Sequence, residues 1–406
     1  MCLRPSYSHA KIVWITPHRG NSPEENAEKT TKLMLHWIRE IYQVGVSATP
    51  KFVQLRAKEA PMPLQIDAPP GKETSATARA FRACAGAGEI VIGLINNMPD
   101  AALDATESQF SSLLEAAADS LPVHLRYSTL PEVPRSWVAQ ARIQNAYWPI
   151  EELLQEGLDA LIVTGTEPKA AQLDQEPYWP RLVGVLEWAQ ENTTSSIWSC
   201  LAAHAAVLHF DGVKRRRLEE KCCGIFEYKV TAGHDLMVGL GATIRTPHSR
   251  WNDLPLADLV TAGYELLSQS EQAGADIFVK QGRSLLVFLQ GHPEYEDCTL
   301  LKEYRRDIGR YLAGQQEHYP TLPCAYCPPA ALATLVAFRD QAMSCRSEAL
   351  LASFPGTSLS SLLVNCWRPT AIQLYKNWLS FITTHRYSQR SARKSVSLPT
   401  AWGGAI

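Results

Sequence analysis

The fold of this chain is decided by residues 195–206, which read Ser-Ser-Ile-Trp-Ser-Cys-Leu-Ala-Ala-His-Ala-Ala. The apolar pair Ile197 and Trp198 indicates a buried strand, and the alanines that follow Cys200 favour a helix. A strand that turns at once into a helix forms an elbow, where a nucleophile stands clear of the sheet and faces the positive end of the helix dipole. That position favours the reactive thiolate. Taken alone, the stretch fits a buried structural cysteine better, since that is the commonest role of cysteine.

Apolar runs and amphipathic segments alternate around this elbow. Besides the strand at Ile197 and Trp198, the predicted buried strands are 90–95, 123–127, 160–163 and 284–289, with shorter antiparallel strands at 223–230 and 276–279. The predicted helices include one opened by a capping box at Thr106 and Gln109, a short one at 151–155, and longer ones at 180–192 and 299–312. This alternation predicts an α/β fold with a doubly wound, mostly parallel sheet, whose sites lie at the carboxyl ends of the strands.

Composition shifts suggest four regions. Residues 1–88 are expected to be a poorly defined N-terminal extension, with a strand at 12–15 and a helix at 24–42. Residues 89–318 are the expected catalytic domain. Residues 319–390 are an expected C-terminal helical extension, with a helical pair in 320–366 and an aromatic-rich helix at 371–382, and residues 391–406 are a disordered tail. We also expect residues 1–61 to be dispensable and Met62 to be the start of the functional protein.

Charge and hydropathy exclude several classes of partner. The net charge of the 406-residue chain is −2, which argues against nucleic acid or an anionic membrane. No apolar run reaches the length of a membrane span, and the N-terminus lacks the apolar core of a signal peptide. Ten cysteines without a paired framework fit the reducing cytoplasm.

A second chemical signal lies about 90 residues after the elbow. His292 and Glu294 follow a buried strand immediately, and Pro293 keeps the segment extended, so both side chains can lie on one side of the chain. Because parallel strands end at one edge of the sheet, these residues can meet Cys200 there as its base and the base's orienting partner. His204, four residues after Cys200, is a less suitable base because the elbow nucleophile points away from the first helical turn.

A metal site is not predicted. Cys324 and Cys327 resemble half of a zinc site, but no second cysteine pair or histidine pair accompanies them. No bound cofactor is expected either.

Several motifs together resemble the MetA-type homoserine O-acyltransferases (homoserine O-succinyltransferase or O-acetyltransferase), which have a class I glutamine amidotransferase-like α/β fold. The matching segments occur in the family order over roughly residues 62–312 and the tail helix. They are 97–99 with 106–109, 163–165, 178–180, 198–203, Lys221 before Gly224, 247–250, 291–295, 299–300 with 303–307, and 377–379. Pro-His-Ser-Arg at 247–250 and Gly-His-Pro-Glu-Tyr at 291–295 are the most specific of these.

The resemblance implies roles for individual residues. Cys200 would accept the acyl group, His292 would be the general base and Glu294 its partner, while Lys221, Ser249 and Arg306 would line the substrate pocket. A guanidinium such as that of Arg306 suits the carboxylate of homoserine. Backbone N–H groups suit the oxyanion, and the candidates are the Leu201 N–H and the loop 165–167. Acyl-CoA would be the co-substrate, with no nucleic-acid or membrane partner, and the oligomeric state stays open between a monomer and a homodimer.

The acyl donor rests on Lys169, which falls where the family carries its acyl-selecting residue. In the family, glycine there leaves room for succinyl, whereas glutamate leaves only acetyl. We predict succinyl-CoA over acetyl-CoA, because a buried Lys169 ammonium could pair with the succinyl carboxylate and would lack a partner otherwise. The expected reaction is ping-pong acyl transfer to homoserine in methionine biosynthesis. The alternatives are a glutamine amidotransferase-like hydrolase, an acyltransferase for another hydroxy amino acid, and a non-enzymatic binding protein.

Overall fold

The computed structural model describes residues 63–72, 88–231 and 233–390. These residues belong to one compact unit, which spans Met62–Ile406. The predicted strand at 12–15, the helix at 24–42 and the tail 391–406 lie outside the described residues. None of the helices in the described part of the chain has the length and apolar character that crossing a bilayer requires.

The larger of two sheets carries the elbow. Its strand order is β1-β3-β2-β4-β5-β12-β11-β8. The first six of these strands are parallel, and β11 and β8 continue the sheet in antiparallel pairing. The bounds are β1 Leu64–Ile66, β2 Ile90–Ile95, β3 Val123–Ser128, β4 Ala160–Val163, β5 Ser195–Ser199, β8 Glu265–Leu266, β11 Ile277–Gln281 and β12 Leu285–Leu289. The strands β2, β4, β5 and β12 are buried along their whole length, as their apolar runs predict.

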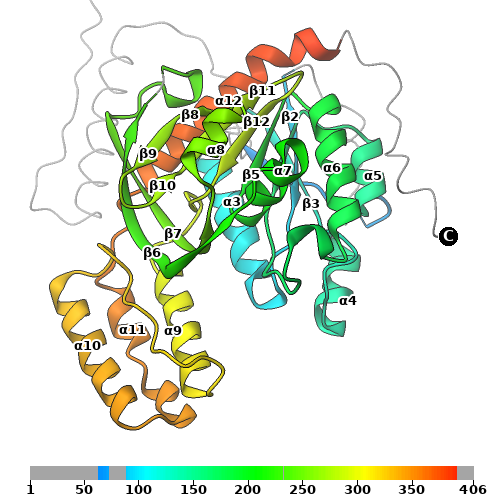
Figure 1. Cartoon of the computed structure of the whole chain (residues 1–406). Coiled ribbons are helices and arrows are strands. Elements are labelled where there is room, and N and C mark those ends of the chain that lie inside the picture. The colour runs from blue at the N-terminus through cyan, green and yellow to red at the C-terminus, as the bar shows by residue number, and fades with distance from the viewer. Residues whose placement is uncertain (1–62, 73–87, 232, 391–406) are drawn as a thin grey trace, which may run out of the picture. The chain divides into compact units, whose positions relative to one another are not determined.

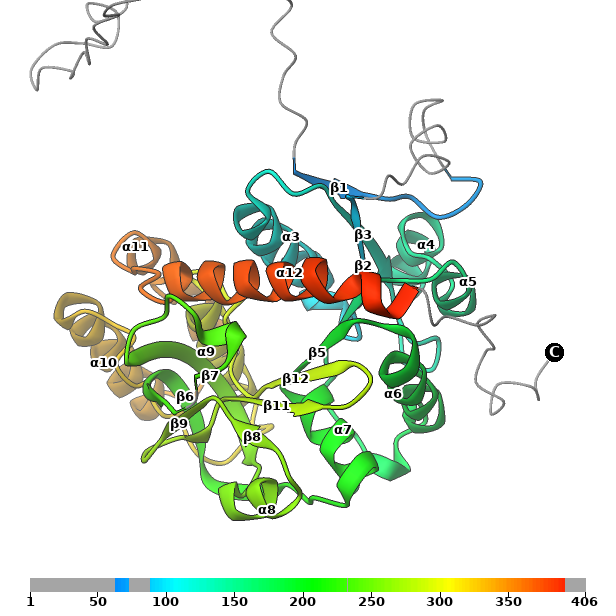
Figure 2. The same ribbon diagram turned by 90° about the horizontal axis from the view of Figure 1, so that it is seen from above.

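Helices cover both faces of this sheet (Figures 1 and 2). One face packs against α3 and α12, the other against α5, α6 and α7. The helix bounds are α3 Leu103–Ala118, α4 Trp137–Ala146, α5 Ile150–Gln155, α6 Trp179–Asn192, α7 Leu201–Asp211, α8 Leu256–Thr261 and α12 Arg368–Arg390, with 3-10 turns η1 Asp100–Ala102, η2 Leu173–Gln175 and η3 Asp235–Met237. The indole N–H of Trp378 in α12 donates to Ser195 Oγ at 2.9 Å, so the tail helix is tied to the strand that carries the elbow.

A smaller antiparallel sheet flanks the edge of the larger sheet at which the parallel strands end. Its order is β10-β9-β6-β7, with β6 Arg216–Val230, β7 Thr243–Asp253, β9 Ser268–Ser270 and β10 Gly274–Ala275. Tyr228 and Ile244 of this sheet are buried in the same apolar cluster as α12 and β12. The small sheet therefore packs beside the strand that leads to His292.

A third apolar cluster joins the helices that follow (Figure 1). They are α9 Thr299–Leu312, α10 Pro329–Ser344 and α11 Gly356–Ser360, with the 3-10 segment η4 Glu348–Ser353. In the predicted helical pair within 320–366, one helix is long and the other has only five residues.

The doubly wound, mostly parallel α/β fold is confirmed, and so are most predicted elements. The capping box at Thr106 and Gln109 is wrong, because α3 begins at Leu103 and both residues lie inside the helix. Gln109 instead donates to Thr299 Oγ1 at 2.8 Å. Residues 64–66, which we assigned to the N-terminal extension, form β1 and pair with β3.

Candidate active site

Cys200 occupies a strained turn between β5 and α7. Its φ is 51° and its ψ is −110°, a conformation that non-glycine residues rarely adopt. The Cys200 N–H donates to Leu289 O of β12 at 2.7 Å, and its carbonyl accepts from the His204 N–H at 3.2 Å. The neighbouring strand and the new helix therefore hold the turn from both sides. The cysteine remains partly exposed, as an elbow nucleophile must.

His292 and Glu294 meet Cys200 at this edge of the sheet. His292 Nδ1 and Glu294 Oε1 are 2.8 Å apart, and His292 also interacts with Cys200 by hydrogen bonding and by charge. Burial by itself lowers the pKa of His292, but the negative charges of Glu294 and Cys200 outweigh it and raise that pKa well above the ordinary value. The arrangement therefore favours the protonated form of His292 beside Cys200 and Glu294.

The backbone and Tyr295 hold the His292 ring in place. The His292 N–H donates to Pro247 O of β7 at 2.9 Å, and the Tyr295 ring stacks on the imidazole at a centroid distance of 4.3 Å. The Tyr295 hydroxyl in turn donates to Glu303 Oε1 of α9 at 2.8 Å. The small sheet and α9 thus fix the orientation of the candidate base.

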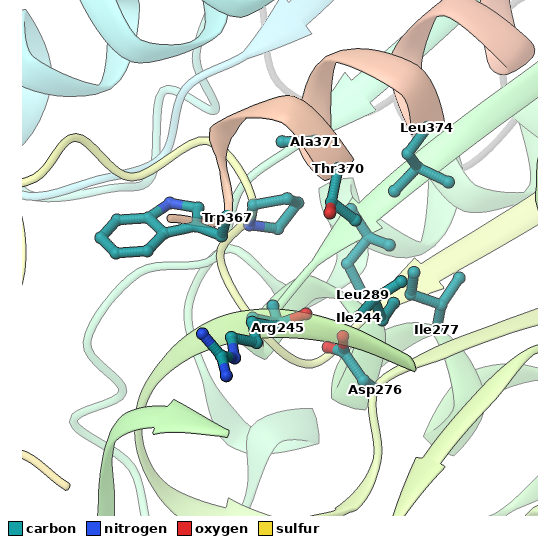
Figure 3. A pocket seen from close by; sticks show the side chains of 11 residues that line it. Ile244, Arg245, Asp276, Ile277, Leu289, Trp367, Thr370, Ala371 and Leu374 are labelled. Carbon is teal, nitrogen blue, oxygen red and sulfur yellow. The ribbon is translucent and has the colours of Figure 1, made fainter. Parts of the chain in front are cut away.

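Asp276 holds the segment that leads into His292. Its backbone carbonyl accepts from the Gln290 N–H and its Oδ1 from the Gly291 N–H, both at 2.9 Å. Gly291 is required here, because a Cβ would lie 2.4 Å from Thr246 Cγ2. Asp276 also lines a small cavity, mostly apolar, between β7, β11 and the start of α12 (Figure 3). Burial raises the pKa of the Asp276 carboxyl to about 6.

We predict that Asp276 makes the protein less stable as the pH rises from 4 to 7. The folded carboxyl binds its proton more tightly than the unfolded one, so its contribution is present below pH 4 and is lost as the pH passes 6. The difference between the ordinary carboxyl pKa and 6 corresponds to roughly 3 kcal/mol. In Asp276→Asn this loss should disappear, which urea unfolding of both proteins at pH 4 and pH 7 measures. Equal pH dependence in the two proteins would contradict the prediction.

His204 is excluded as the base by its surroundings. Its side chain is buried beneath the elbow helix, and His204 Nε2 lies 3.0 Å from Gln290 Oε1. Burial lowers the pKa of His204 to about 3, so it stays neutral at pH 7. It is a packed histidine that ties α7 to the end of β12.

The first turn of α7 and the loop after β4 form a candidate oxyanion site. The N–H groups of the first helical turn have no partner inside the helix, and the Leu201 N–H directly follows the nucleophile. Gly165 lies tightly against this turn, because a Cβ there would be 2.4 Å from Leu201 Cβ. The loop that begins at Gly165 therefore lies beside Leu201, and the oxyanion role of both remains a prediction.

The predicted pocket residues Lys221, Ser249 and Arg306 lie in one region, and Asp307 binds two of them. Lys221 Nζ donates to Asp307 Oδ2 at 2.6 Å, and Arg306 Nε donates to Asp307 Oδ1 at 2.9 Å. The Arg306 side chain is about half exposed, and its Nη2 lies 4.0 Å from Glu303 Oε2. Ser249 Oγ is buried, and it has no hydrogen-bond partner among the described residues.

The predicted burial of Lys169 is wrong. We expected a buried ammonium, but the Lys169 side chain is exposed. Only its backbone is held, because Glu176 Oε1 accepts from the Lys169 and Ala170 N–H groups at 2.5 and 2.7 Å. An exposed ammonium can be solvated by water, so the cost that we assigned to an acetyl donor is absent.

The cysteine pair at 324 and 327 belongs to a structural contact. Cys324 bridges to Gly224 of β6 through its backbone. Among residues 63–72, 88–231 and 233–390, no group of three or more histidine, cysteine or acidic side chains could hold a metal ion.

The fold and the site together define an α/β protein of the nucleophile-elbow class, with cysteine at the elbow and a histidine–glutamate pair beside it. Within that class, the chain belongs to the homoserine O-succinyltransferase family and is an acyltransferase. The sequence model of that family matches residues 75–389.

Individual relatives agree with this assignment. A protein of Rhodopseudomonas palustris described as homoserine O-succinyltransferase is 47% identical over 295 residues, which cover 73% of this chain and 89% of the relative. Its counterpart from Methylorubrum extorquens is 45% identical over 292 residues and covers 72% of this chain and 87% of the relative. Among solved structures, a glutamine amidotransferase from Methylobacillus flagellatus aligns with 72% of this chain and 95% of its own, at 13% identity and a TM-score of 0.41.

Proposed function

We propose that this protein transfers a succinyl group from succinyl-CoA to the hydroxyl of homoserine through a thioester on Cys200. The observation that carries the proposal is the meeting of Cys200 with the His292–Glu294 pair at the elbow. The names of the relatives support homoserine as the acceptor and succinyl as the acyl group. In this reading the reaction belongs to methionine biosynthesis in the cytoplasm.

In the first half-reaction, the Cys200 thiolate attacks the thioester carbonyl of succinyl-CoA. The Leu201 N–H and the loop 165–167 stabilise the oxyanion of the tetrahedral intermediate. The carbon–sulfur bond to CoA then breaks, and the His292 imidazolium gives its proton to the departing CoA thiolate. The enzyme is left with a succinyl thioester on Cys200 and a neutral His292.

In the second half-reaction, homoserine takes the place of CoA. Neutral His292 removes the proton of the γ-hydroxyl, and the oxygen attacks the Cys200 thioester. The Cys200 thiolate leaves, which restores the thiolate and imidazolium pair. Arg306 would hold the α-carboxylate through its outer N–H groups, with Lys221 and Ser249 beside it.

The donor preference tests the proposal. We expect kcat/KM for succinyl-CoA to exceed that for acetyl-CoA at least about tenfold, because a charge-assisted hydrogen bond to the succinyl carboxylate is worth about 1.5 kcal/mol or more. The measurement is homoserine-dependent CoA release with each donor. A preference for acetyl-CoA would contradict the succinyl assignment. Ammonia release from glutamine without any acyl transfer would favour the amidotransferase alternative.

A further inference from the structure

Several buried side-chain atoms have no hydrogen-bond partner within the described part of the chain, and two of them belong to residues that interact electrostatically with each other. These two are Nη1 of Arg215 and the hydroxyl of Tyr178. Arg215 lies in the short connection between α7 and β6, and Tyr178 precedes α6 directly. Tyr178 is only 6% exposed. Buried donors are nearly always satisfied in folded proteins, so such a pair points to a missing ligand.

The two side chains lie close to different parts of the candidate site. Tyr178 lines a small cavity together with Gly165, Thr166 and Leu201, the residues of the candidate oxyanion site. The Arg215 guanidinium interacts electrostatically with Tyr178, Glu176 and Cys200. A ligand attached to Cys200 and extending toward α6 would therefore approach both unpaired donors.

Arg215 supplies a positive charge to this region, and Tyr178 supplies a neutral donor beside it. Burial lowers the pKa of Arg215, yet a guanidinium stays protonated at pH 7 and must keep its charge. Burial raises the pKa of Tyr178, so its hydroxyl stays a hydrogen-bond donor. Glu176 interacts with Arg215 through its charge, while its Oε1 accepts from the Lys169 and Ala170 N–H groups.

We propose that Arg215 and Tyr178 bind the free carboxylate of the succinyl donor and so determine the acyl specificity. A succinyl group carries its carboxylate two methylene groups beyond the thioester carbonyl, whereas an acetyl group ends at a methyl. With the carbonyl oxygen at the Leu201 N–H, only the longer acyl group has a charge to offer Arg215. The guanidinium can bind a carboxylate through two parallel hydrogen bonds, and the Tyr178 hydroxyl supplies a third.

This inference deepens the proposed function and rests on it. It also moves the selectivity from the exposed ammonium of Lys169 to the partly buried guanidinium of Arg215. The loop that carries Lys169 still contributes, since its backbone amides hold Glu176, which interacts with Arg215 through its charge.

The test compares both donors across three variants. In Arg215→Gln, kcat/KM for succinyl-CoA should fall about 100-fold, because hydrogen bonds to a charged group are lost. In Tyr178→Phe it should fall about fivefold to tenfold, because one neutral donor is lost. For acetyl-CoA, both variants should stay within about threefold of the parent protein, since a methyl group engages neither donor. Lys214→Gln is the matched control: it removes one positive charge from an exposed neighbour and should leave both donors unchanged.

The outcomes separate this inference from the proposed function. If the parent protein transfers no succinyl group to homoserine, the proposed function fails. If the parent transfers succinyl and Arg215→Gln loses both donors equally, Arg215 serves CoA binding or Cys200 instead, and the inference is overturned. Unchanged succinyl transfer in Arg215→Gln overturns it as well. Arg215→Lys guards against misfolding, because it keeps the charge and should recover part of the succinyl preference that Arg215→Gln loses.

Discussion

Replacing Cys200 with alanine should reduce homoserine-dependent CoA release at least about 10⁴-fold, because loss of the nucleophile removes covalent catalysis altogether. The fold should survive, since the Cys200 side chain makes no capping hydrogen bond to α7. The turn is held by backbone bonds that alanine keeps. Initial rates of CoA release, together with thermal unfolding of both proteins, measure the two expectations.

The matched control for this variant is Cys345→Ala. Cys345 is an exposed thiol at the end of α10, and its removal should leave the rate within about twofold, as is usual for surface positions. A Cys200→Ala protein with near-parental turnover would show that the acyl group passes directly from CoA to homoserine.

Replacing His292 with alanine should lower kcat about 10³-fold, the usual contribution of a general acid–base residue. Both half-reactions need this ring: it protonates the departing CoA and deprotonates homoserine. Glu294→Gln should cost less, about 100-fold, because an amide can still accept from Nδ1–H but does not carry the charge that stabilises the imidazolium.

His209→Gln provides the comparison for these two variants. His209 lies on α7 and pairs with Glu187 at 3.3 Å, away from the His292–Glu294 pair. We expect parental rates from it. The assignment of His292 would be wrong if His292→Ala kept its rate while His209→Gln lost it.

Much of this site could be predicted from local sequence because each of its main parts follows a buried strand. The apolar pair Ile197 and Trp198 of β5 leads to Cys200, and the apolar run at 285–289 ends three residues before His292. Since β5 and β12 are parallel neighbours, these two strand ends had to meet. The bounds of α9 could also be predicted, because its amphipathic pattern is strong.

What could not be predicted depends on contacts between distant segments. The edge strand β1 is held by Asp67, which binds His124 at 2.9 Å and Arg126 at 3.1 Å across nearly sixty residues of sequence. Arg215 stands among four consecutive basic residues, a run that sequence alone treats as a solvated surface. Only its burial distinguishes it from Lys214. The opposite error affected Lys169, whose alignment position suggested burial although its side chain is exposed.

The thioester on Cys200 is the central claim, and intact mass spectrometry tests it most directly. The protein is mixed with succinyl-CoA in the absence of homoserine, the reaction is quenched in acid, and the intact mass of the protein is measured. We predict a gain of one succinyl group, located on the peptide that contains Cys200 and removed when homoserine is added before the quench. An unchanged mass in a preparation that still transfers succinyl to homoserine, or a stable adduct on another residue, would contradict the account.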